Sequence, residues 1–414
     1  MASEFKVSVS DSQLSLLKQK LQLTRLPDEI DDAGWDYGVP LADIKRLVAR
    51  WKDGYDWRKH EKQLNDELPQ FTRDIEVDGH GVLNIHYVYK RSEAKGAIPL
   101  FFAHGWPGSI IEVRKILPLL TAVEDGKPSF DVVAMSLPGY GFSEGTKKKG
   151  FDMPKYAEVG HKLMTALGYN EYVVQGGDWG YFITRTMSTI YGPQNHVKGW
   201  HTNSPFVAPP SDVDPSQYND EEKAAVKHNE WFTTKGNGYF VEQSTQPQTI
   251  GYSLSDSPVG LLAWIYEKLV TWSDAYAWED DESESENSLQ RLNLLKRLSS
   301  VLTWISIYWF SRSGPAASVR TYYEVAQMQA AMKKAQVQAP KVTVPTGASF
   351  FPEEVMQVPL HWVNREFNIV FHSKHDKGGH FAAYEVPDLL VSDLKKMYGK
   401  GGPAYGVVSG KDGY

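Results

Sequence analysis

The chain of 414 residues contains no cysteine. Disulfide bonds, thiolate metal sites and a cysteine nucleophile are therefore excluded together. The sequence has no Asn-x-Ser/Thr glycosylation site and no run apolar enough to span a membrane, and the opening Met-Ala-Ser-Glu-Phe-Lys lacks the apolar core of a signal peptide. We therefore expect a soluble, cytoplasmic protein without a membrane anchor.

An excess of positive charge is also lacking. The 44 Lys and Arg residues face 51 Asp and Glu residues, which gives a net charge of −7 and argues against a nucleic-acid partner. Aromatic residues are abundant at 13%, and they can line an apolar ligand pocket or thicken a core. The length is typical of one large α/β domain with additions.

The order of predicted elements favours an α/β fold. Residues 13–18 and 41–51 have the pattern of amphipathic helices, and a hairpin is expected from 72–77 and 82–89. From residue 98 onward, strands alternate with helices. Continuous apolar runs predict a mostly parallel sheet buried on both faces, with strands at 99–103, 130–135, 172–174 and 197–201.

This alternation stops near Pro205. Residues 205–325 have the character of helices and loops, and strand signals resume at 342–344 and 369–371. A helical insertion at this point predicts a lid over an active site. Within it, the acidic run 279–286 is interpreted as a solvated loop.

The chain thus divides into four predicted parts. These are residues 1–95, an N-terminal segment with the first strands; 96–204, the first half of the core; 205–325, the lid; and 326–414, the second half of the core.

The most informative stretch is Val173-Val174-Gln175-Gly176-Gly177-Asp178-Trp179-Gly180, where an apolar strand enters a glycine-rich turn before a helix-like segment. This context is typical of the nucleophile elbow of an α/β-hydrolase, in which small neighbours let one side chain project freely. The side chain here is the carboxylate of Asp178. A carboxylate attacks sp³ carbon and becomes an alkyl ester, whereas the serine of an esterase attacks acyl carbon.

An ester on Asp178 needs a base for its hydrolysis, and His380 is the candidate. It lies in Gly378-Gly379-His380-Phe381, a glycine-rich segment after the last predicted strand, where this fold keeps its histidine. The carboxylate that orients the histidine is expected just past the preceding strand. Glu353 and Glu354 are adjacent there, and spacing alone does not choose between them.

Backbone donors for an oxyanion hole are expected on His104-Gly105-Trp106-Pro107-Gly108, which follows a strand. The amides of Trp106 and Trp179 are the natural pair. We interpret His104 as a structural residue of this turn.

Two other patterns resemble ligand sites without completing one. His372, His375, Asp376 and His380 are spaced like a metal cluster, but no HExxH helix or further ligand set accompanies them, and no metal is predicted. The turn at 137–143 is rich in glycine but lacks a complete GxGxxG fingerprint, so no nucleotide cofactor is predicted.

Together these motifs resemble those of epoxide hydrolases of the microsomal type, closest to the soluble fungal members. The resemblance spans nearly the whole chain and implies an α/β-hydrolase fold with a helical lid and an N-terminal meander around core and lid. The segments that carry it are His104-Gly-Trp-Pro-Gly, Gly176-Gly-Asp-Trp-Gly, Gly378-Gly-His-Phe-Ala-Ala, and Trp35-Asp-Tyr-Gly with Tyr55-Asp-Trp-Arg.

The resemblance also implies residue roles. Two lid tyrosines of the family hydrogen-bond the epoxide oxygen, and they match Tyr239 and Tyr322, with Tyr323 as the alternative if the register slips by one. A phenol with a pKa of roughly 10 can protonate the departing alkoxide while staying neutral at pH 7. The family's acid follows Phe-Pro-x, which matches Glu354 in preference to Glu353.

The reaction implied is hydrolysis of a small hydrophobic epoxide by water to a vicinal diol without a cofactor. A homodimer is expected by family analogy only. The main rival is a haloalkane dehalogenase, which shares the aspartate elbow followed by Trp but needs neither paired tyrosines nor an N-terminal meander. A second rival is a non-catalytic member of the fold that binds a hydrophobic ligand, and the presence of every expected catalytic group argues against it.

Overall fold

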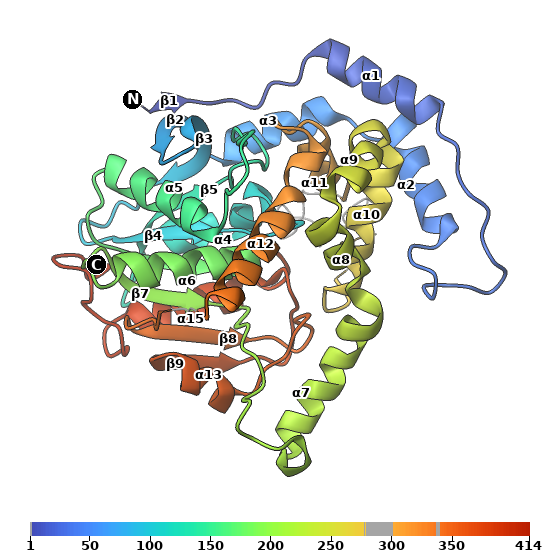
Figure 1. Ribbon diagram of the computed structural model, residues 1–414. Helices are drawn as coiled ribbons and strands as arrows, with labels where there is room; N and C mark the ends of the chain where they lie inside the picture. Colours follow the sequence, from blue (N-terminus) through green and yellow to red (C-terminus); the bar gives the residue numbers. More distant parts are fainter. Residues whose placement is uncertain (1, 277, 279–300, 337–339) are drawn as a thin grey trace.

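The computed structural model describes residues 2–276, 278, 301–336 and 340–414, and the strands in these ranges form a single sheet (Figure 1). In chain order they are β1 (Ser3–Glu4), β2 (Gln70–Val77), β3 (Gly81–Lys90), β4 (Ile98–Ala103), β5 (Phe130–Met135), β6 (Tyr172–Gly176), β7 (Val197–Thr202), β8 (Thr346–Phe350) and β9 (Ile369–Lys374). They lie in the order β1-β2-β3-β5-β4-β6-β7-β8-β9.

Strand direction divides the sheet into two parts. The pairs β1–β2, β2–β3 and β3–β5 are antiparallel, and every pair from β5 across to β9 is parallel. All residues of β4 and β5 are buried, as a parallel sheet covered on both faces requires. The α/β-hydrolase fold predicted from the sequence is confirmed.

Helices cover both faces of the sheet. The core helices are α4 (Val113–Thr121), α5 (Met153–Ala166), α6 (Trp179–Tyr191), α13 (Leu360–Glu366), α14 (Ala382–Glu385) and α15 (Pro387–Tyr398). On one face, α5 and α6 pack against each other, with α5 beside β2 and α6 beside β6 and β7. On the other, α4 and α15 pack together, with α4 beside β5 and α15 beside β8 and β9. The loops at the carboxyl ends of the parallel strands are therefore held on a rigid base.

A helical insertion separates β7 from β8. Its described helices are α7 (Asp220–Trp231), α8 (Gly238–Thr245), α9 (Pro247–Asp256), α10 (Pro258–Thr271), α11 (Val301–Trp309) and α12 (Arg320–Lys334). Helix α8 lies against α12, and α10 lies against α9 and α11 (Figure 1). The acidic run 279–286 falls outside the described residues.

The strand predicted at 342–344 is wrong. The chain there is irregular, and β8 begins only at Thr346. Pro345 has no N–H to donate to a ladder, and its carbonyl accepts the bond from the Trp200 amide at 3.0 Å. Gly347 within β8 packs so closely that a Cβ would lie 2.5 Å from the Met397 sulfur. Small residues, and not the preceding valines, therefore form the middle of this strand.

The N-terminal segment contributes α1 (Asp11–Gln22), α2 (Leu41–Asp53) and α3 (Trp57–Glu67). Ser10 caps α1 in a reciprocal capping box with Gln13, so the helices predicted near 13–18 and 41–51 are confirmed. The predicted hairpin is also confirmed, with β2 and β3 paired from Gln70↔Val88 to Val77↔Gly81. The segment reaches the insertion, because α1 and α2 contact α10, and α3 contacts α11.

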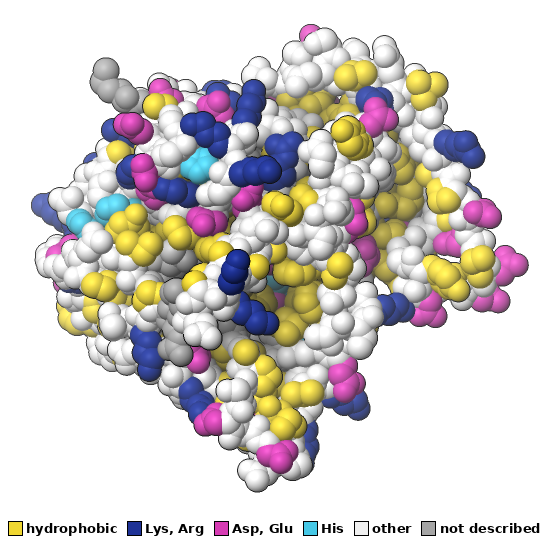
Figure 2. All heavy atoms as spheres, viewed as in Figure 1, with side chains coloured by type: hydrophobic (Ala, Val, Ile, Leu, Met, Phe, Trp, Pro, Cys, Tyr) yellow, Lys and Arg dark blue, Asp and Glu magenta, His cyan; other side chains and the backbone are white. Residues whose placement is uncertain are grey.

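The described helices contain no membrane span, and the face in view has no patch of charge of a single sign. None of the helices in the described ranges has both the length and the apolar character needed to cross a bilayer. On the face in Figure 2, basic and acidic side chains are interspersed among hydrophobic ones.

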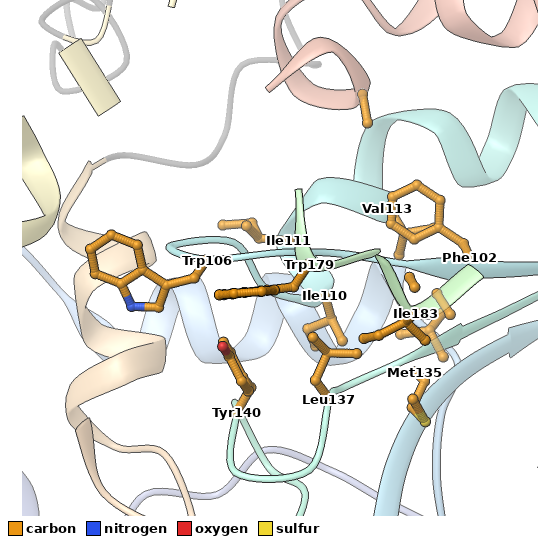
Figure 3. Packing of buried hydrophobic residues seen from close by; sticks show 14 of the residues in the cluster. Phe102, Trp106, Ile110, Ile111, Val113, Met135, Leu137, Tyr140, Trp179 and Ile183 are labelled. Atoms are coloured by element: carbon orange, nitrogen blue, oxygen red, sulfur yellow. The ribbon is translucent and has the colours of Figure 1, made fainter. Parts of the chain in front are cut away.

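The hydrophobic core extends from the sheet into the loops that follow β4, β5 and β6. Figure 3 shows Trp106 and Trp179 beside Leu137 and Tyr140, at one end of a layer that continues to Phe102. All five side chains are buried. The backbone on either side of Asp178 is thus fixed by packing, which is what a site of defined geometry needs.

Candidate active site

Asp178 lies at a sharp turn between β6 and α6. Its φ of 53° and ψ of −127° are rare for a residue with a side chain. The turn requires small neighbours, because a Cβ on Gly176 would lie 2.4 Å from the Gly180 carbonyl oxygen, and a Cβ on Gly180 would lie 2.0 Å from that of Ala103. Because α6 begins at Trp179, its N-terminal dipole favours a negative charge on Asp178.

A chain of contacts joins Asp178 to His380 and Glu354. The His380 Nε2 atom lies 3.4 Å from Asp178 Oδ2, and its Nδ1 atom lies 2.5 Å from Glu354 Oε1. The Ser204 hydroxyl donates to Glu354 Oε2 at 2.5 Å, and the Val355 amide donates to Oε1 at 2.8 Å. Glu354 is therefore oriented from two sides and holds the Nδ1 proton of the histidine, which leaves Nε2 facing the nucleophile.

Glu353 takes a different position. Its side chain is exposed, and its backbone pairs with Gly379. Of the two adjacent carboxylates that the sequence offered, the structure brings Glu354 to His380.

The environment of His380 favours its charged form. Burial alone lowers the pKa of this histidine, but the carboxylates of Glu354 and Asp178 more than offset that effect and raise the pKa well above its usual value. In the free protein, His380 and Asp178 therefore form an ion pair.

The loop after β4 supplies a backbone donor to the nucleophile. The Trp106 amide donates to Asp178 Oδ1 at 2.8 Å, and Trp179, the other predicted oxyanion residue, follows Asp178 directly at the start of α6. The ring of His104 lies within the loop, with Nδ1 2.9 Å from the Gly105 carbonyl and Nε2 3.3 Å from the Leu137 amide.

The insertion holds this loop from the other side. From α11, Trp304 donates its indole N–H to the Pro107 carbonyl at 2.5 Å, and Tyr308 donates its hydroxyl to the Gly108 carbonyl at 2.6 Å. The position of the Trp106 amide thus depends on the helical insertion as well as on the core.

Tyr239 on α8 and Tyr322 on α12 meet above this loop. Their ring centroids are 5.8 Å apart, and Trp106 stacks on Tyr239 at 5.2 Å with an interplanar angle of 10°. Tyr322 also meets Trp179 edge to face at 4.6 Å. Burial, together with the negative charge of Asp178, raises the pKa of both phenols well above 10. Both therefore remain neutral proton donors.

Tyr323, the alternative to Tyr322, is only half-buried. Its neighbour Tyr322 is 2% exposed and lies within ring contact of Trp106, Trp179 and Tyr239. The structure thus places Tyr322, and not Tyr323, beside the nucleophile.

The residues weighed as a metal cluster do not converge. His375 binds Asp393 in the core, with Nε2 2.7 Å from Oδ2, whereas His380 binds Glu354. His372 and Asp376 are exposed.

Glu112 is a site residue that the sequence reasoning missed. It lies just before α4 and lines a cavity of about 10 Å³ together with Asp178 and His380, which is room for about one water molecule. Burial raises the pKa of Glu112 to about 8. A carboxylate within the apolar stretch Ile110-Ile111-Glu112-Val113 was the available signal, but nothing in it pointed toward Asp178.

Comparison with known proteins agrees with this geometry. Residues 2–113 match the family described as "Epoxide hydrolase N terminus", and residues 98–235 match the "alpha/beta hydrolase fold" family. A putative epoxide hydrolase of Stigmatella aurantiaca is 37% identical, covering 95% of this chain and 84% of that protein. Epoxide hydrolase 1 of Sus scrofa is 35% identical, covering 95% and 88%.

A solved structure extends the likeness to the fold. The Aspergillus niger epoxide hydrolase superposes with a TM-score of 0.78 at 32% identity and covers 95% of each chain. Similarity of sequence and fold over nearly the full length, on top of the arrangement around Asp178, shows that this chain belongs to the epoxide hydrolases of the microsomal type.

Proposed function

We propose that this epoxide hydrolase opens its substrate through a covalent ester on Asp178. The carboxylate attacks a ring carbon, and the C–O bond breaks with its electron pair moving to the ring oxygen. Tyr239 and Tyr322 hold that oxygen, and one of them gives it a proton. The products of this step are a hydroxyalkyl ester and a phenolate, so negative charge moves from the carboxylate to the phenol.

The second step returns the protein to its starting state. Ester formation removes the negative charge of Asp178, so one of the two influences that raise the pKa of His380 disappears. The histidine then passes its proton to the phenolate, which restores the phenol, and the neutral imidazole deprotonates a water that attacks the ester carbonyl. The amides of Trp106 and Trp179 stabilise the oxyanion, and its collapse releases the diol and leaves Asp178 ionised and His380 protonated, as at the start.

The observation that carries this proposal is the setting of Asp178. One carboxylate oxygen accepts the Trp106 amide, and the other faces His380 Nε2 at 3.4 Å. The small cavity lined by Glu112 adjoins the same two side chains, which supports it as the position of the attacking water.

Isotope labelling tests the proposal. Water attack on the ester carbonyl leaves the water oxygen in Asp178 and releases an aspartate oxygen in the diol. With enzyme in excess over styrene oxide in H₂¹⁸O, we expect an unlabelled diol after one turnover and ¹⁸O in the Asp178 peptide. A labelled diol with an unlabelled peptide would instead show direct attack of water on the epoxide.

We also propose that helices α7 to α12 form the lid and that the N-terminal segment anchors it. Supporting contacts join the two parts, since α1 and α2 touch α10, and the Tyr55 hydroxyl lies 3.0 Å from the Thr303 hydroxyl of α11. This corresponds to the division at 1–95, 96–204, 205–325 and 326–414. The anchoring would keep Tyr239 and Tyr322 over the nucleophile.

A further inference from the structure

A buried lysine lies against one of the two tyrosines. Lys268 on α10 is 3% exposed, and its Nζ atom lies 4.7 Å from the centre of the Tyr239 ring and 5.9 Å from that of Trp272. Its acidic neighbour Glu267 lies 2.8 Å from Nζ. The ammonium thus contacts the aromatic face of a candidate proton donor.

Holding a charge at this position is unfavourable for folding. Burial lowers the pKa of Lys268, and the carboxylate of Glu267 offsets this effect only in part. A methionine fills a similar space without the cost of removing a charge from water. The stability of the fold therefore does not explain the cation, whereas its position beside Tyr239 suggests a part in the reaction.

The other charges near Tyr239 oppose its role as an acid. After burial, which has the largest effect, the carboxylates of Asp178, Glu267 and Glu354 all raise the pKa of Tyr239, and the nearby Tyr322 phenol partly offsets them. The ring of Tyr239 also contacts four other aromatic side chains, namely Trp106, Phe232, Phe240 and Trp272. A phenolate in this setting needs a compensating positive charge.

We propose that Lys268 is a positioning residue for ring opening, whose charge stabilises the Tyr239 phenolate formed as the epoxide oxygen is protonated. The inference rests on the proposed function, because it requires Tyr239 to lose a proton. An ammonium over an aromatic face attracts the ring electrons, and the attraction increases as the ring gains negative charge. The effect falls on ester formation and not on ester hydrolysis.

Single-turnover kinetics with styrene oxide tests this separation. Rapid quenching and peptide mass spectrometry follow the Asp178 ester as it forms and decays. For Lys268→Met we expect ester formation to slow about tenfold, the size of a desolvated cation–π contact. Hydrolysis should change less than about twofold, and Lys268→Arg should recover most of the lost rate.

A double-mutant cycle identifies the partner. In a Tyr239→Phe background no phenolate forms at this position, so adding Lys268→Met should slow ester formation no further. Lys268→Gln keeps a polar end for Glu267 and replaces the methionine variant if that protein does not fold. Thermal unfolding of each variant checks that the fold is intact.

The outcomes separate two kinds of failure. If the wild-type protein turns over without an ester on Asp178, the proposed function itself is wrong. If the ester forms but the neutral variant that folds, Lys268→Met or Lys268→Gln, slows ester formation and ester hydrolysis equally, the role of Lys268 is wrong. The same conclusion follows if that variant slows neither step. An additive effect of the two substitutions would also overturn it, because the lysine would then act independently of Tyr239.

Discussion

Two carboxylates beside His380 differ in what surrounds them. Glu354 accepts hydrogen bonds from the histidine, from Ser204 and from the Val355 amide. Glu112 lines the small cavity that Asp178 and His380 also line, and burial raises its pKa to about 8. The two are therefore suited to different tasks, Glu354 to holding a positive charge on His380 and Glu112 to contacting a water as a neutral acid.

Glu354→Gln tests the first of these tasks. The amide cannot balance the imidazolium that forms during ester hydrolysis, so we expect that step to slow about 10²- to 10⁴-fold. Glu353→Gln is the matched control and should change the rate less than twofold, because Glu353 is exposed. Decay of the Asp178 ester after a single turnover is the measurement. The opposite ranking would move the orienting acid to Glu353.

Glu112→Gln tests the second task through pH. As the pH rises through about 8, Glu112 gains a negative charge beside the ester, which opposes the oxyanion that forms during hydrolysis. The wild-type rate of ester hydrolysis should therefore fall above pH 8, whereas the glutamine variant, which stays neutral, should lack this fall. Identical pH profiles for the two proteins would remove Glu112 from the reaction.

Sequence alone located some site residues better than others. Asp178 and His380 lie in local motifs with unmistakable glycines, so both could be chosen without a structure. Choosing Glu354 over Glu353 required a family resemblance, because adjacent residues differ only in the direction of the side chain. Glu112 and Lys268 approach the site through tertiary contacts that no local pattern encodes.

At the scale of elements, Tyr239 and Tyr322 come from two helices that are far apart in the chain. Helices α8 and α12 pack together, which brings Tyr239 and Tyr322 within 5.8 Å of each other between ring centres. Each phenol is buried against tryptophans of the core, so its direction is fixed before a substrate arrives. The sequence predicted helices in this region and the family resemblance paired the two tyrosines, but the packing of α8 against α12 was not predicted.

Tyr239→Phe and Tyr322→Phe test the paired donors. Each substitution removes one hydroxyl without changing the packing, so each should slow ester formation about 10- to 100-fold, and the double variant should nearly stop it. Tyr323→Phe is the control, since Tyr323 is half-buried outside the aromatic group. The rate of Asp178 ester formation is the readout. Normal turnover by the double variant would show that the tyrosines only pack.

Strand β8 shows where reasoning from local pattern fails. The valines at 342–344 have strong strand character, yet the strand is Thr346–Phe350, which contains Gly347, Ala348 and Ser349. Close contact with α15 favours these small residues, and Pro345 ends the preceding segment. Tertiary packing overrides propensity at this position.

At the scale of the whole molecule, the N-terminal segment joins the insertion to the core. Its helices touch α10 and α11, and the Tyr55–Thr303 hydrogen bond spans 248 residues of sequence. The alternation of strands and helices sufficed to predict the hydrolase core, the helical character of 205–325 predicted a lid, and the family resemblance added the meander. A homodimer and a cytoplasmic location stay predictions, because a single chain tests neither.

Tyr55→Phe measures how much this connection contributes. Losing the hydrogen bond to Thr303 should lower the free energy of unfolding by about 1 kcal/mol. Denaturant unfolding gives that value, and the rate of epoxide hydrolysis in the absence of denaturant should stay within twofold. A large loss of activity with unchanged stability would show that the contact acts on the site and not on the fold.

The central claim is that Asp178 becomes an ester which His380 then hydrolyses. The most direct test is intact and peptide mass spectrometry of His380→Gln mixed with styrene oxide. Without its base the protein should stall, so we predict an adduct of epoxide mass confined to the Asp178 peptide. A folded His380→Gln protein without that adduct, when the wild type converts the same epoxide to diol, would contradict the account.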